Sequence, residues 1–175
     1  MTRVCALSLL LTTAITPALA EDFGASVDQM LAAKSMALFG IAAPLAASAP
    51  ASAEEGYRQP ASVAADSVAL ADGLTAAFLT RDAANNSDMM AFYPAEAPTH
   101  LIACIESDLE TLGDGRLNPG VQRISLADGK VETILRGTNS CDGIRATAWG
   151  TILFTEEDDA GGAYEVLDPL TTTEV

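Results

Sequence analysis

The side chains that could do chemistry in this sequence are carboxylates and a thiol. Glu106 and Asp108 end one predicted strand, Cys141 and Asp142 lie in a loop, and the acidic run from Glu156 to Asp159 ends another strand. Groups at strand ends can converge at one mouth of a β scaffold. Carboxylate oxygens are the ligands that calcium prefers, whereas a thiolate among them favours a transition metal such as iron. The acidic run is equally typical of a solvated turn.

Other kinds of catalytic site find little support in the sequence. The chain has a single histidine, His100, which lies in an apolar run and is more typical of a polar residue at a strand edge than of a base. The sequence contains no glycine-rich phosphate loop, no C-x-x-C pair and no EF-hand spacing. A metal site built from oxygen and sulfur ligands is therefore the chemistry that the residues favour.

The elements that would position these groups are short strands. From Ser67 onward, runs rich in Val, Ile, Leu, Phe, Thr and Tyr alternate with Gly, Asp, Asn and Pro. The predicted strands are Ser67 to Leu70, Thr75 to Thr80, Met89 to Tyr93, His100 to Glu106, Val121 to Leu126, Lys130 to Leu135, Thr151 to Thr155 and Ala163 to Leu167. The clearest hairpin turns at Ala127-Asp128-Gly129, where Gly129 can adopt the left-handed conformation that such a turn needs.

Meandering strands at this spacing suit an all-β sandwich, an open barrel or a β-propeller. A propeller blade holds four strands, so the predicted strands would make about two blades, fewer than the roughly four that a closed propeller needs. The sequence ends in a strand-like run from Thr171 to Val175. We therefore expect an incomplete propeller from a truncated chain, with a small complete β domain as the alternative.

The first twenty residues have the pattern of a cleavable secretory signal peptide. Arg3 supplies a positive charge, Val4 to Ile15 form an apolar run, and Ala18-Leu19-Ala20 gives the small-x-small site before Glu21. The run is too short for a membrane span, which needs roughly 20 apolar residues. We expect cleavage between Ala20 and Glu21 and a periplasmic or extracellular location.

Residues 21–60 are expected to form a short helix and a linker, with the β region at 61–175. A helix is predicted from Ser26 to Phe39, with a capping box at Ser26 to Gln29 and a stop at Gly40. An Ala, Ser and Pro-rich linker follows. Cys104 and Cys141 remain after cleavage, and an oxidising compartment would allow either a disulfide between them or a free thiolate.

The charge balance restricts the partners. The chain has 24 acidic and 9 basic residues, for a formal net charge of −15. Such a surface repels phosphate backbones and anionic membranes, so nucleic acid is not an expected partner and no membrane contact is expected after cleavage. Divalent cations suit it, although acidic residues also serve solubility alone. The oligomeric state is left open.

Several stretches of the sequence resemble a known family. Asn139 to Gly143, followed by Thr147 to Glu157, resembles the N-C-x-G-G-x-T-P-W-G-T-W-L-T-C-E-E signature of PhoX-type secreted alkaline phosphatases. Upstream, Asp88 to Pro94 and His100 to Glu106 look like the D-G-M-x-F-x-P segment and the L-L-V-V-N-H-E strand of that family. The resemblance covers about Ala71 to Asp168.

The resemblance implies a β-propeller that hydrolyses phosphate monoesters with a cluster of iron and calcium. By position, Cys141 would be the thiolate ligand to iron, Glu156 or Glu157 a metal ligand, and Glu106 another. Trp149 would be structural, in a turn beneath the site. The cations would neutralise a small phosphorylated substrate and hold a nucleophilic oxygen in line. The remaining ligands would lie beyond Val175.

Two other functions stay open. Cys141 to Gly143 and Gly161 to Pro169 also bear a loose likeness to calcium-dependent lactonases of the gluconolactonase kind. A non-catalytic secreted propeller or binding protein is the third possibility.

Overall fold

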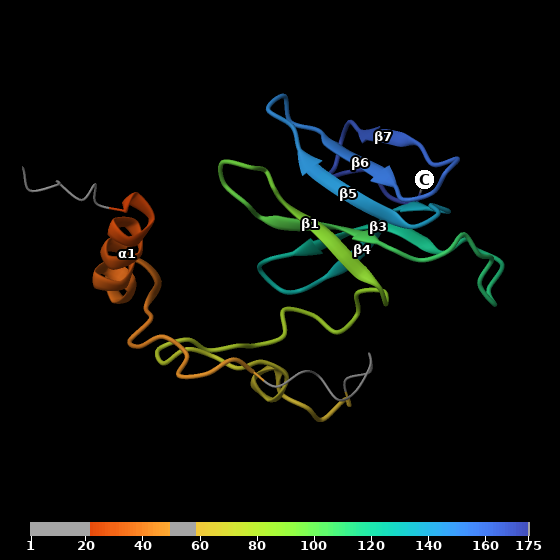
Figure 1. The fold of residues 1–175 in the computed structure, drawn as a ribbon. Helices are drawn as coiled ribbons and strands as arrows, with labels where there is room; N and C mark the ends of the chain where they lie inside the picture. The colour runs from red at the N-terminus through yellow and green to blue at the C-terminus, as the bar shows by residue number, and fades with distance from the viewer. Residues whose placement is uncertain (1–21, 50–58, 175) are drawn as a thin grey trace, which may run out of the picture. The chain divides into compact units, whose positions relative to one another are not determined.

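The computed structural model describes residues 22–49 and 59–174, and these form two compact units divided between Ala76 and Ala77. Each unit is described by itself. The predicted signal peptide at 1–20 and part of the predicted linker lie outside the described residues. The N-terminal unit contains α1 and η1, and the C-terminal unit contains all seven strands (Figure 1).

Helix α1 (Phe23–Phe39) confirms the predicted helix, but it begins three residues before the expected capping box at Ser26. The cap is Asp22, whose carboxylate accepts hydrogen bonds from the backbone N–H groups of Gly24 and Ala25 at 2.9 and 3.4 Å. An aspartate carboxylate satisfies two of the free N–H groups of a first turn, which places the start here. Gly40 ends the helix in the left-handed conformation, with φ of 69°. Within the part of the chain that the structure describes, no helix is long and apolar enough to cross a bilayer.

Two predicted strands, Ser67 to Leu70 and Thr75 to Thr80, are wrong. The first overlaps the end of the 3-10 helix η1 (Ala64–Ser67), and the second belongs to no sheet. A run of β-type residues becomes a strand only when a neighbour supplies the ladder of hydrogen bonds. Here the chain has only an isolated bridge between Ala43 and Asp72.

Sheet 1 is an antiparallel meander in the order β1-β2-β3-β4. Its strands are β1 (Ser87–Tyr93), β2 (His100–Ile105), β3 (Pro119–Ser125) and β4 (Val131–Arg136). All four were predicted from the sequence. The turn between β3 and β4 is also confirmed, because Gly129 has φ of 72° and its N–H bonds the carbonyl of Ser125 at 2.9 Å.

Sheet 2 is a second antiparallel meander, in the order β5-β6-β7. Its strands are β5 (Cys141–Ala146), β6 (Ile152–Glu156) and β7 (Ala163–Val166). The sequence predicts β6 and β7, but it predicts a loop where the structure has β5. Its sequence, Cys-Asp-Gly-Ile-Arg-Ala, is poor in β formers. Hydrogen bonds to β6 and packing against β1 and β2 make it a strand all the same.

The core lies between the two sheets (Figure 1). One face of sheet 1, its inner face, contributes side chains such as Ala91 and Ile102, and the inner face of sheet 2 contributes side chains such as Ile144 and Phe154. The opposite faces are called the outer faces below. The C-terminal segment is tied to β3 through Arg123, a buried side chain that bonds the Glu132 carboxylate at 2.9 Å and the carbonyl oxygen of Pro169 at 2.7 Å. The described residues are thus mostly β, in two antiparallel sheets that do not close on each other.

Candidate functional site

The structure brings carboxylates from both sheets to one end of the molecule. β1 and β5 begin at this end, and β2 and β6, which run antiparallel to them, finish there. The Asp88 carboxyl on β1 and the charge of Glu157 both raise the pKa of the Asp142 carboxyl on β5. We call this the carboxylate end, with Asp88, Glu106, Asp142 and Glu157 as its four acidic residues.

A structural repeat accounts for this convergence, because the hairpin β1-β2 and the hairpin β5-β6 have the same construction. A residue with positive φ precedes each first strand, Asn86 at 61° and Ser140 at 52°. Its carbonyl accepts a hydrogen bond from the N–H of a glutamate after the second strand, at 2.8 Å for both Glu106 and Glu157.

The repeat extends to the register of the strands. The pairing shifts between Ser87 and Met90 in the first hairpin and between Cys141 and Ile144 in the second. The third strands also match, since Leu101 pairs with Ile124 in sheet 1 as Ile152 pairs with Val166 in sheet 2. Asp88 and Asp142 therefore occupy the same position in two copies of one unit.

The neighbouring Asp88 carboxyl changes the acid chemistry of Asp142. The hydrogen bond to Asp88 is the largest cause that raises the pKa of Asp142, and desolvation and the negative charge of Glu157 add to it. The two carboxylates carry like charges, and a bound cation would offset their repulsion.

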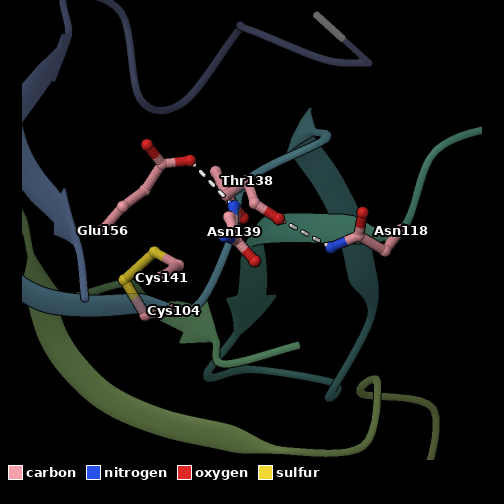
Figure 2. The surroundings of a disulfide bond; sticks show 6 residues. All are labelled: Cys104, Asn118, Thr138, Asn139, Cys141 and Glu156. Carbon is pink, nitrogen blue, oxygen red and sulfur yellow. Dashed lines mark hydrogen bonds between the residues drawn. A yellow bond between two sulfur atoms is a disulfide. The ribbon is translucent and has the colours of Figure 1, made fainter. Parts of the chain in front are cut away.

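Cys141 is bonded to Cys104 in a disulfide that joins β5 to β2, and both residues are fully buried (Figure 2). A disulfide sulfur is not a thiolate, so in this form Cys141 cannot be the anionic sulfur ligand that the family resemblance implies for iron. The disulfide instead ties the two sheets together beside the carboxylate end. The iron half of the expected metal cluster therefore does not fit the residues as the structure holds them.

Glu156 lies beside the disulfide, and its carboxylate is already hydrogen-bonded to neighbouring groups of the protein. Its carboxylate accepts hydrogen bonds from the N–H of Asn139 at 2.8 Å, the N–H of Gly162 at 3.0 Å and the hydroxyl of Tyr164 at 2.9 Å, and Figure 2 shows the first of these. Burial alone would raise the pKa of Glu156, but the three hydrogen bonds outweigh it and lower the pKa. Glu156 thus fixes the loops on either side of sheet 2, and of the two glutamates it is Glu157 that faces Asp142.

The remaining residues singled out from the sequence are more dispersed. Asp158 accepts hydrogen bonds from Asn139 and from the N–H of Ala160, as a turn residue does. His100 bonds Thr99 at the opposite end of its hairpin. Trp149 is 70% exposed in the β5-β6 turn, also at that opposite end, and its indole N–H donates to Glu165 at 2.7 Å.

Asp88 is the residue of this end that sequence reasoning missed as a site residue. The signal that could have found it is the match between Asn86-Ser87-Asp88 and Ser140-Cys141-Asp142, each placed just before a run of β-type residues. Among the described residues, no group of three or more His, Cys, Asp or Glu side chains is arranged to hold a metal ion. The carboxylate end as it stands offers the Asp88–Asp142 pair with Glu157 nearby.

No family model, curated protein or solved structure matches the chain.

Proposed function

We propose that the protein is an exported, metal-dependent hydrolase of the phosphatase type, acting on small phosphate monoesters, and that its two sheets are successive blades of a β-propeller. The repeated hairpins support the propeller, because each blade of such a fold repeats one meander and places its first strand near the central axis. In such a propeller β1 and β5 would be these first strands, and they contact each other.

The observation that carries the proposal is the contact between Asp88 and Asp142 at the shared end of the two sheets. Each carboxylate comes from the same position in the repeat, and Glu157 adds a third negative charge to Asp142. Hard oxygen ligands of this kind suit calcium. A bound cation would neutralise the charge of a phosphate group and polarise its oxygens.

The residues of this chain would have separate tasks. Asp88 and Asp142 would hold the cation, with Glu157 and Glu106 at its border. Glu156 would keep the loops after β6 and before β5 in place through its hydrogen bonds to Asn139 and Gly162. In the oxidised form Cys141 would contribute rigidity through the disulfide.

A second candidate function is favoured by that disulfide. With the sulfur of Cys141 bonded to Cys104, the ligands left at this end are oxygens alone, which suits a calcium-dependent propeller hydrolase such as a lactonase. Both functions place a cation between Asp88 and Asp142. They differ in substrate, which is a phosphate monoester for the first and a cyclic ester for the second.

Calcium binding and hydrolysis can be tested together. Isothermal titration with Ca²⁺ should give binding that Asp142→Asn weakens at least tenfold, while Glu96→Gln, in the loop between β1 and β2 at the opposite end, leaves it unchanged. The same proteins would be assayed on p-nitrophenyl phosphate and on a lactone. If Asp142→Asn binds Ca²⁺ as tightly as the wild type, the proposed site is wrong. If the protein hydrolyses neither ester, or if chelation leaves its activity unchanged, the metal-dependent function is wrong.

A further inference from the structure

Each sheet has one covered face and one partly uncovered face. The inner faces pack against each other in the core. On the outer face of sheet 1, Met90 is 42% exposed and Phe92 is 58% exposed, and on the outer face of sheet 2, Leu153 is 40% exposed. These large apolar side chains lie within strands and are exposed on the outer faces.

The repeat shows what kind of surface would cover them. Met90 has the position in β1 that Ile144 has in β5, and Ile144 is 1% exposed because the inner face of sheet 1 covers it. In the same way Leu153 has the position in β6 that Ile102 has in β2, and Ile102 is fully buried against sheet 2. Each outer face is thus the counterpart of a face that is already packed.

The large exposed side chains on the outer face of sheet 1 are confined to β1, because Ala103 and Ile105 on β2 are fully buried. Farther across this sheet, Gln122 and Ile124 are buried, and the side chain of Gln122 accepts a hydrogen bond from the N–H of Ala84 at 2.8 Å. The chain segment before β1 therefore covers the β3 side and leaves Met90 and Phe92 uncovered.

The outer face of sheet 2 has an apolar centre with a charge on either side. Leu153 pairs with Arg145 on β5 and with Glu165 on β7, so the three form one row across the sheet. An apolar centre with a charged rim is the composition of a protein interface.

We infer that the outer face of sheet 2, centred on Leu153, binds the outer face of sheet 1, centred on Phe92, of a second copy of this chain. The contact would continue the interface that sheets 1 and 2 already form within one chain. The contact is heterologous, because two different faces meet. Each assembly therefore keeps one free outer face of sheet 1 and one of sheet 2, and a further copy can bind there. The inference does not depend on the proposed cation site.

Sedimentation velocity of the full chain over a range of concentrations tests this inference. The wild type should show a mass that increases with concentration. Phe92→Lys and Leu153→Lys should each raise the dissociation constant about tenfold or more, because each puts a charge into an apolar contact. Leu109→Lys, at a residue that is 55% exposed in the loop after β2, is the matched control and should associate like the wild type.

A mixture of the two variants distinguishes a heterologous contact from any other. Phe92→Lys keeps its Leu153 face and Leu153→Lys keeps its Phe92 face, so an equimolar mixture should form a dimer that grows no further. All three substituted residues are exposed, so thermal unfolding should confirm that the variants fold normally. A wild type that stays monomeric at every concentration would overturn the inference, as would association that both variants leave intact or a mixture that forms no dimer.

Discussion

The Cys104–Cys141 disulfide leads to the prediction that the structure quantifies best. It joins β2 of one sheet to β5 of the other across a sequence separation of 37 residues, and both cysteines are fully buried. Breaking it by reduction, or by the double change Cys104→Ala and Cys141→Ala, should lower the free energy of unfolding of the C-terminal unit.

The expected size of this loss comes from the closed loop. In the chain-entropy model a disulfide stabilises by about 3 kcal/mol for a loop of 15 residues and by about 4.7 kcal/mol for a loop of 100. A loop of the present length lies between them, at about 4 kcal/mol. That is a large share of the roughly 5–15 kcal/mol that stabilises an ordinary domain.

Urea unfolding followed by far-ultraviolet circular dichroism measures this effect, in a Cys5→Ser background so that only two cysteines remain. For a dependence on urea of about 1–3 kcal/mol per molar, the midpoint should fall by between about 1 and 4 M. Dithiothreitol should lower the midpoint of the parent protein but not that of the double variant, which separates the covalent link from the loss of two side chains.

Two results would contradict this reasoning. One is alkylation of both Cys104 and Cys141 in native protein that has not been reduced, because buried and bonded sulfurs should not react. The other is a double variant that unfolds at the midpoint of the parent.

Three further predictions concern single side chains. Glu156→Gln should cost about 1–3 kcal/mol in urea unfolding, because an amide NH₂ would face N–H and O–H donors where a carboxylate oxygen now accepts them. Gly129→Ala should cost more than about 1 kcal/mol, because its φ is 72° and an added Cβ would collide with the carbonyl oxygen of Leu79, whereas Gly113→Ala, which has open space, should cost less in the same assay. Hydrogen bonds from Thr and Trp side chains lower the pKa of Glu165. Its contribution to stability is therefore complete above about pH 4.3 and is lost as the pH falls through the lowered folded-state value. The fluorescence of the chain's single tryptophan should report that step, and a step that persists in Glu165→Gln would assign it to another group.

The sequence was most informative where local patterns decide the structure. Runs of β-type residues between turn residues predicted β1 to β4, β6 and β7, and the turn at Gly129 followed from the positive φ that the turn needs. The sequence was least informative where pairing with another strand decides the structure. Two runs of β-type residues belong to no sheet, and β5, rich in residues that disfavour strands, became a strand by pairing with β6.

For the carboxylates and the thiol, too, the sequence determines one part of the role and the fold determines the other. The sequence by itself determined that acidic residues follow strands and that Cys141 has either a disulfide or a metal-binding role. Only the tertiary structure decided that Cys141 pairs with Cys104, that Glu156 holds its own loops, and that Asp88 meets Asp142. The reason is that these contacts join segments far apart in the chain, and only the packing of one sheet on the other brings them within reach.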